Sequence, residues 1–171
     1  MRSSANPDKL RGSDFAQIAW DAIEPIWDDL PFSHYRRLVS FMEELSLGQR
    51  SLISVDWCQK EIRNGGIAQL FCNPTGNLVP WALVGFRVIG AEAFADVLEK
   101  AVSMLGPEYP TSGSARRKAY VKATPQQKQE IEQLEDRFFA LLRDPAVDFE
   151  RRRGSYVLEH PHQFTRGALD G

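Results

Sequence analysis

Apolar residues recur every three or four positions in successive stretches of this chain, which is the spacing of one face of an α-helix. Residues 91–105 give the cleanest example, with Phe94, Leu98 and Leu105 on one side. No stretch shows the sustained alternation of apolar and polar residues, enriched in β-branched side chains, that marks a strand. The sequence therefore predicts an all-α fold, a compact bundle of about seven helices with no substantial sheet.

Helix signals in the first half of the chain come from single residues. Ser13 is a candidate N-cap, and Pro25 should kink the first helix or start a second one at Glu24. A second helix is expected over 34–47, with Gly48 as its stop, and a third over 49–64, ending at Asn64-Gly65-Gly66.

The second half has a clearer start signal and a clear loop. Thr124 is a candidate N-cap, followed by Pro125 at the first helical position and Gln127 at the third, and this helix should end at Asp144-Pro145. The other expected segments are an apolar turn over 67–71, a type I turn over 73–76, helices over 77–89 and 91–105 divided by Gly90, a loop over 106–114, and one or two short helices within 146–164.

The length of 171 residues suits one domain, expected over 13–164. Residues 1–12 are predicted to form a disordered tail, and residues 165–171 are predicted to be a frayed C-terminus. A net charge of −2 gives no global field that would attract nucleic acid or an anionic membrane, so neither is an expected partner. The absence of a signal peptide or an apolar run of about 20 residues favours a cytoplasmic location.

The most suggestive charge pattern lies near the amino end. Five carboxylates occur from Ser13 to Tyr35 without any Lys or Arg, and they are Asp14, Asp21, Glu24, Asp28 and Asp29. At 100° per residue they fall on one side of a helix, opposite the apolar residues. Duplex DNA of the same length, about 24 Å, carries about 14 phosphates, about half of them on one face. Glu43 and Glu44 would extend the patch, and the alternative is an ordinary solvated helix face.

The other candidate residues do not indicate a nucleic-acid, metal or catalytic site. Two basic clusters are interpreted as charge-neutralising surface rather than as a nucleic-acid site. The first contains Arg116, Arg117, Lys118 and Lys122 with Tyr120 beside them, and the second runs from Arg151 to Arg153. His160 and His162 are too few ligands for zinc, and Cys58 and Cys72 lack an accompanying His motif. No catalytic residue, metal or cofactor is therefore expected.

Asn64, Gly65, Gly66 and Gln69 form a structural motif or a small polar pocket. The pocket interpretation allows a small hydrolase-like enzyme with Glu61 as its acid, and the structural interpretation has the glycines ending a helix. The structural interpretation is favoured because no nucleophile accompanies these residues.

The stretch from Glu61 to Asn73, EIRNGGIAQLFCN, resembles the signature of the DNA mimic protein 19 family, whose members are mostly of unknown function. The resemblance continues over roughly residues 50–164, through Ile89-Gly90-Ala91, Val97 to Ala101, Leu134 to Phe139, Tyr156 and Phe164. It implies a helical fold, a homodimer, and acidic side chains that imitate DNA phosphates toward a DNA-binding protein.

These observations lead to one principal hypothesis and two alternatives. The principal one is a non-catalytic protein-interaction domain whose acidic N-terminal helix face binds a basic protein surface, in the manner of a DNA mimic that inhibits a DNA-binding protein. An antidote or immunity-type protein that neutralises a toxin is the first alternative, and the small hydrolase-like enzyme is the second.

Overall fold

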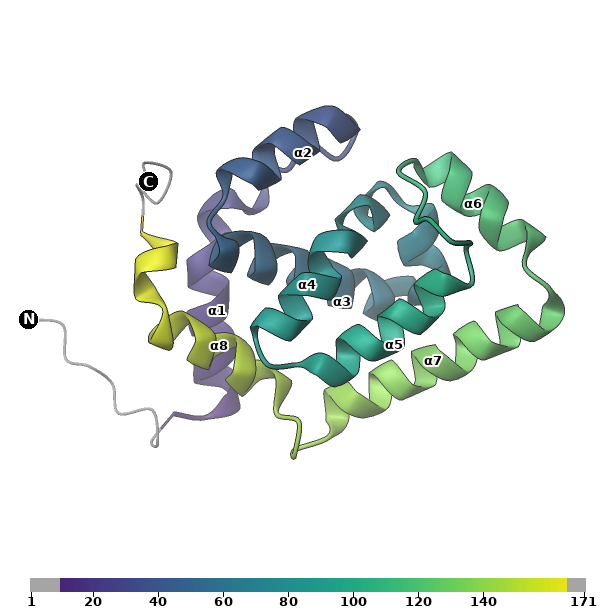
Figure 1. The fold of residues 1–171 in the computed structure, drawn as a ribbon. Coiled ribbons are helices and arrows are strands. Elements are labelled where there is room, and N and C mark those ends of the chain that lie inside the picture. Colours follow the sequence, from purple (N-terminus) through teal and green to yellow (C-terminus); the bar gives the residue numbers. More distant parts are fainter. Residues whose placement is uncertain (1–9, 166–171) are drawn as a thin grey trace, which may run out of the picture.

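The computed structural model describes residues 10–165, so most of the predicted tail and of the frayed C-terminus lie outside the described residues. Within this range the chain is all-α, with eight α-helices, two 3₁₀ helices and no strand, which confirms the predicted fold class (Figure 1). The elements are α1 (Gly12–Trp27), α2 (Tyr35–Glu44), α3 (Leu47–Cys72), η2 (Pro74–Leu78), α4 (Val79–Val88), α5 (Glu92–Ser103), α6 (Gly113–Lys122), α7 (Pro125–Arg143), α8 (Phe149–Glu159) and η3 (Pro161–Phe164).

Helix α3 runs through the middle of the bundle, with α4, α6, α7 and α1 packed around it (Figure 1). Its first half is buried on almost every side, including Leu52, Ile53 and Val55, and Ile62 in the next turn is also buried. Helix α4 crosses it closely, since a Cβ on Gly85 would lie 2.7 Å from the Ser51 carbonyl oxygen. Because this half is enclosed, even its polar residues Ser51, Ser54, Asp56 and Gln59 are buried.

Two helix starts are fixed by capping boxes. Thr124 accepts a hydrogen bond from Gln127 N at 3.1 Å and its own N–H donates to the Gln127 side chain, as predicted. Ser46 and Gln49 make the same reciprocal pair at the start of α3. The prediction that Gly48 stops the second helix is wrong, because α2 already ends at Glu44 and Gly48 lies in the first turn of α3.

The predicted break at Asn64-Gly65-Gly66 is present as a kink. Gly65 and Gly66 have non-helical dihedral angles, and Gly66 has a φ of +82°, which favours glycine. The chain then returns to a helix through Cys72, so the predicted apolar turn over 67–71 is instead helical. The next turn follows the prediction, since Gly76 N donates to Asn73 O at 3.0 Å.

Two further helix predictions need correction. Helix α1 passes through Pro25 as one helix and ends at Trp27, so no second helix begins at Glu24. Pro25 lies in the last turn, where its missing N–H removes one hydrogen bond near the helix end. Helix α6 was not predicted, because its sequence lacks an amphipathic pattern and its one fully buried residue is the charged Arg116.

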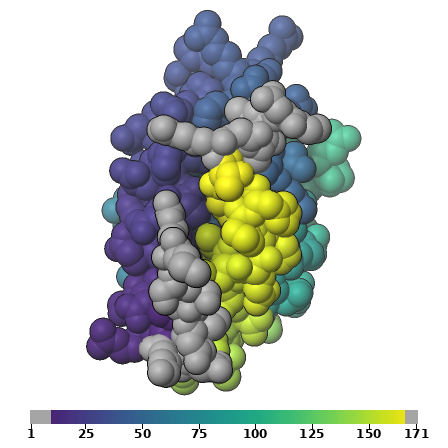
Figure 2. Space-filling view, turned by 90° about the vertical axis from the view of Figure 1, so that its left-hand side faces the viewer, coloured from purple at the N-terminus to yellow at the C-terminus, as the bar shows by residue number. Residues whose placement is uncertain are grey.

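Helices α1 and α8 lie side by side, which joins the two ends of the described chain (Figures 1 and 2). The contact is close because Gly154 of α8 faces the backbone of Phe15, where an added Cβ would lie 2.6 Å from the carbonyl oxygen. Helix α1 is therefore held on the bundle largely through α8. No helix in residues 10–165 is both long enough and apolar enough to cross a membrane.

Replacing Gly154 with alanine should push α1 away from α8, because the new methyl group would collide with backbone atoms rather than with a movable side chain. We expect a loss of about 1–3 kcal/mol in the free energy of unfolding, measured by urea denaturation. Gly12→Ala is the matched control, since nothing lies within 4 Å of a Cβ there. Equal stability of the two variants would contradict the close α1–α8 contact.

Candidate binding surface on helix α1

The acidic residues predicted on the first helix lie mostly on its outer side. Asp21 and Glu24 are exposed and Asp14 is half-buried, whereas Phe15, Ala19 and Ile23 of the same helix are buried. Asp28 is the C-cap residue and Asp29 follows it, so these two exposed carboxylates extend the acidic surface beyond the helix end. We call these five residues the α1 acidic surface.

The carboxylates of this surface are nearly free of basic partners. Asp14 accepts a hydrogen bond from the backbone N–H of Arg11 at 2.8 Å and lies 3.9 Å from the exposed Arg11 guanidinium, and Asp21 accepts from Gln17 Nε2 at 2.6 Å. Among the residues that the structure describes, Asp21, Glu24, Asp28 and Asp29 form no ion pair. Glu43 and Glu44, at the end of α2, are also exposed.

A cluster of half-buried aromatic rings lies beneath this surface. Trp27 stacks on Trp57 of α3 at a centroid distance of 4.2 Å, and Trp20 meets Trp27 edge-on at 5.1 Å. The ammonium group of Lys60 lies over both α1 rings, 4.5 Å from Trp20 and 4.1 Å from Trp27. Lys60 is therefore held by the rings, and also by Asp56 at 2.9 Å, instead of by the α1 carboxylates.

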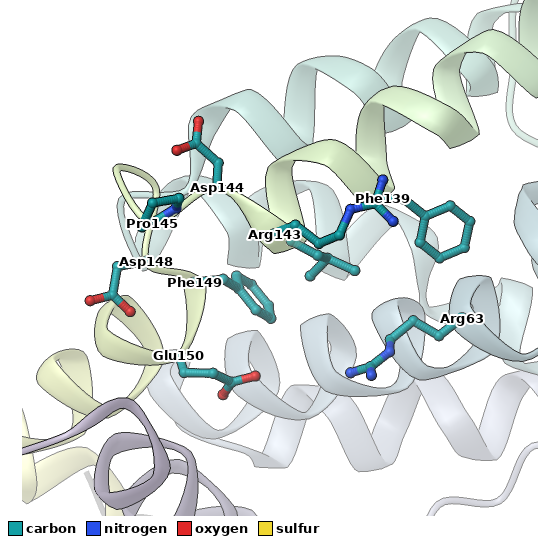
Figure 3. A pocket seen from close by; sticks show the side chains of 9 residues that line it. Arg63, Phe139, Arg143, Asp144, Pro145, Asp148, Phe149 and Glu150 are labelled. Carbon is teal, nitrogen blue, oxygen red and sulfur yellow. The ribbon is translucent and has the colours of Figure 1, made fainter.

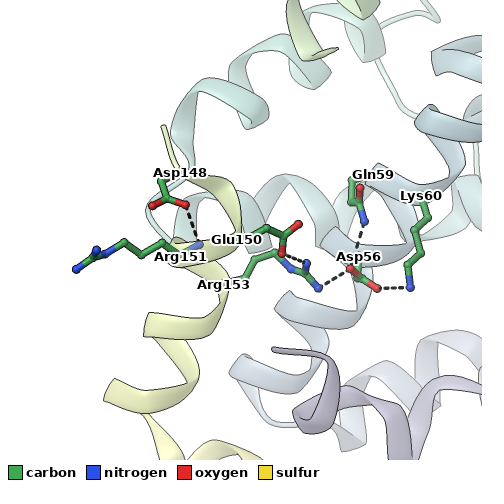
Figure 4. A network of polar contacts seen from close by, with 7 residues as sticks. All are labelled: Asp56, Gln59, Lys60, Asp148, Glu150, Arg151 and Arg153. Carbon is green, nitrogen blue, oxygen red and sulfur yellow. Dashed lines mark hydrogen bonds and ion pairs between the residues drawn. The ribbon is translucent and has the colours of Figure 1, made fainter. Parts of the chain in front are cut away.

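The same lysine belongs to a polar network that joins α3 to α8 (Figure 4). Asp56 has only 2% of its side chain exposed and pairs with Arg153 at 2.5 Å. Arg153 also pairs with Glu150 at 2.6 Å, and Gln59 Nε2 donates to Asp56 at 3.3 Å. Because α1 packs against α8, the buried Asp56–Arg153 pair helps to fix the position of the α1 acidic surface.

A separate hollow of about 380 Å³ lies between α3, α7 and α8 (Figure 3). Figure 3 shows Arg63 and Glu150 extending toward the hollow, whereas Asp144 and Asp148 point away from it. Its charges are mixed, and Glu150 is already bonded to Arg153. No Ser, Thr, Cys or His lines it, so its residues provide neither a hydroxyl or thiol nucleophile nor an imidazole base.

The Asn-Gly-Gly motif forms a structural junction. Gln69 Nε2 donates to Glu61 at 2.9 Å, and the Asn73 amide donates to the same carboxylate. Glu135 of α7 accepts from Ile67 N at 2.8 Å, directly beside Gly66. Glu61, Asn64 and Gln69 line none of the main hollows among residues 10–165. The geometry therefore favours the structural interpretation of this motif.

Arg116 contradicts its assignment to a basic surface, because its side chain is fully buried. It donates to the carbonyl oxygens of Phe71, Asn73 and Pro110 and to Asn77 Oδ1, at 2.7 to 3.0 Å. Burial lowers the pKa of this guanidinium, and the electrostatic interaction with Tyr109 opposes that effect. Arg116 thereby satisfies carbonyl groups at the C-terminal end of α3. Sequence reasoning missed it because its acceptors lie mostly around 40 residues away.

The remaining candidates are placed as follows. The ring of His160 stacks on Tyr156, and within the described part of the chain no three His, Cys, Asp or Glu residues converge as a metal site. Arg117, Lys118 and Lys122 are exposed on α6.

Comparison with known proteins finds a family match over most of the helical bundle. The family model described as DMP19-like protein matches residues 43–160, more than half of the chain. The chain belongs to the DMP19-like family. This confirms the resemblance inferred from the Asn-Gly-Gly signature. The matched region runs from the end of α2 to the end of α8, so α1 and its acidic surface lie outside it. No curated protein and no solved structure matches the chain.

The buried pair of Asp56 and Arg153 should contribute strongly to stability. Arg153→Met leaves Asp56 in the core with only the half-exposed Lys60 as a charged partner, and we expect a loss of about 3–5 kcal/mol. The double variant Asp56→Asn, Arg153→Met should recover much of this loss, because no unpaired charge remains buried. Additive losses in urea denaturation would show that the two side chains do not interact.

The two cysteines should differ sharply in reactivity. Cys58 is buried, and burial raises the pKa of its thiol, whereas Cys72 is half-exposed. We expect one thiol of the native protein to react with DTNB at pH 8 and the second to react only after unfolding. Cys72→Ser should abolish the native reaction. Rapid reaction of both thiols would contradict the burial of Cys58.

Proposed function

We propose that this chain is a non-catalytic protein-interaction module that binds a basic protein surface through the α1 acidic surface. The observation that carries the proposal is the set of exposed carboxylates at Asp21, Glu24, Asp28 and Asp29, which no Lys or Arg of the described residues neutralises. Unpaired like charges on one surface repel one another, and a basic partner would relieve that repulsion.

The position of these acids on the helix supports the same conclusion. Glu24, Asp28 and Asp29 lie at the C-terminal end of α1, and the last turn contains no basic residue. The helix dipole disfavours negative charge at that end by about 0.3–1 kcal/mol for each group. These residues therefore do not stabilise α1, which is expected when they serve binding instead.

The rings beneath the surface suggest how a charged contact could become specific. Tryptophan side chains often dominate binding energy at interfaces, and Trp20 and Trp27 are half-buried beside the acids. Lys60 over the two rings shows that they accept a cation. We infer that a Lys or Arg of the partner packs at the edge of this aromatic cluster while other basic residues face the carboxylates.

Membership in the DMP19-like family supports a DNA-binding protein as the partner. The acidic surface would then take the place of DNA phosphates and inhibit that protein. An antidote that covers the active surface of a toxin would use the same contacts and differ only in its partner.

Reversing two charges tests the proposal directly. The wild-type protein is immobilised, loaded with an extract of its source cell at low salt, and eluted with rising salt. Proteins retained by the wild type should be lost with Asp21→Lys, Asp28→Lys, because exposed charge pairs are screened by salt and reversed by these changes. A purified partner should bind the variant at least about tenfold more weakly, measured by calorimetry.

The control carries the same charge change elsewhere. Glu132 and Asp136 are exposed on α7 one helical turn apart, so Glu132→Lys, Asp136→Lys should retain the partner. Retention of the partner by both variants would show that the α1 acidic surface does not bind it. Displacement of the partner by duplex DNA would identify a DNA-binding protein, whereas a partner insensitive to DNA would favour the antidote alternative.

A further inference from the structure

A second region of concentrated charge lies around the start of α6, at the other end of the molecule from α1 (Figure 1). A hollow of about 560 Å³ lies there between the first turns of α6, the end of α3 with η2, and the segment that joins α1 to α2. Its charged residues are Arg117 and Lys118, and no Asp or Glu lines it. The hollow has the size of a small-molecule site.

The two cations are available for a ligand. Both are exposed, and neither forms an ion pair with any residue in 10–165. By contrast, the hollow of Figure 3 and the one lined by Lys100, Glu130 and Arg137 each contain carboxylates next to their cations. The α6 hollow is thus an unbalanced positive site.

Asn77 adds a buried donor to this site. Asn77 is among the residues that line the hollow, although it is only 8% exposed. Asn77 Oδ1 accepts from Arg116 Nη1 at 2.7 Å, which fixes the orientation of the amide. The Nδ2 group is therefore turned away from Arg116, and it has no acceptor among the described residues. Asn77 Nδ2 is therefore available to donate a hydrogen bond to a ligand.

Arg116 places a further positive charge behind Asn77. All four of its hydrogen bonds go to neutral oxygens, and it forms no ion pair within the described chain. A buried cation without a carboxylate partner creates a positive potential that nearby anions reduce. Charge, donor and hollow therefore point to the same kind of ligand.

We propose that the α6 hollow binds the phosphate group of a small phosphomonoester, held by Arg117, Lys118 and Asn77 Nδ2. A phosphate dianion has three acceptor oxygens, which two cations and one neutral donor match in both charge and number. Phe32 and Tyr35 form an aromatic wall of the same hollow, against which the organic part of the ligand packs. The site shares no residue with the α1 acidic surface and does not depend on the function proposed for it.

Calorimetric titration of the full chain with AMP, adenosine and inorganic phosphate tests the proposal. We expect saturable binding of one AMP, weaker binding of inorganic phosphate, and no binding of adenosine, which lacks the anion. Arg117→Gln, Lys118→Gln should weaken AMP binding at least about tenfold, because each lost ion-assisted hydrogen bond removes affinity. The control Lys100→Gln, Arg137→Gln carries the same charge change in another hollow and should bind AMP as the wild type does.

The Asn77→Asp variant distinguishes a loss of ligand binding from a loss of stability. The aspartate has nearly the same shape and would pair with Arg116, so the melting temperature should stay equal or rise. The added carboxylate would repel phosphate, so AMP binding should be lost. Absence of AMP binding to the wild type at millimolar concentration would overturn the proposal. Equal AMP affinity of the wild type and the Arg117, Lys118 double variant, or of AMP and adenosine, would also overturn it.

Discussion

The structure depends on how the enclosed helix α3 satisfies the polar groups that it carries into the core. Asp56, in its buried first half, is neutralised by Arg153 of α8 and Lys60. The carbonyl groups at its other end receive hydrogen bonds from Arg116 of α6. Unpaired polar groups at either place would cost more than a typical hydrogen bond contributes, so α8 and α6 are fixed where their arginines can reach.

Fixing α8 and α6 also decides where the charges of the surface lie. Helix α1 packs on α8 and presents carboxylates on its outer side, whereas α6 presents the exposed cations Arg117 and Lys118. A net charge of −2 conceals this separation. A nearly neutral chain can therefore offer two surfaces of opposite sign, and electrostatic partners of either sign are compatible with the composition.

The family relation applies to one of these surfaces more than to the other. The match over residues 43–160 includes α3 to α8, and with them the Asn-Gly-Gly junction, the Asp56–Arg153 pair and Arg116. Helix α1 lies on the N-terminal side of this matched region and packs on α8 through the close contact at Gly154. The acidic surface is therefore supported by this chain's own charge pattern rather than by the matched part of the family.

Sequence by itself determined the features that depend on neighbouring residues. Apolar spacing predicted the all-α class, Thr124 with Gln127 predicted a helix start, and Gly90 predicted a helix end, because capping and backbone freedom act within a few residues. The glycines after Asn64 predicted a break, which the structure shows as a kink within α3. The run of carboxylates before Tyr35 is likewise visible without a structure. Only the tertiary structure decided the burial of Arg116, the pairing of Asp56 with a residue 97 positions away, and the hollow beside α6. Those features join distant segments, and the local pattern even misled at Gly48, whose small size serves a contact with Phe164 rather than a helix stop.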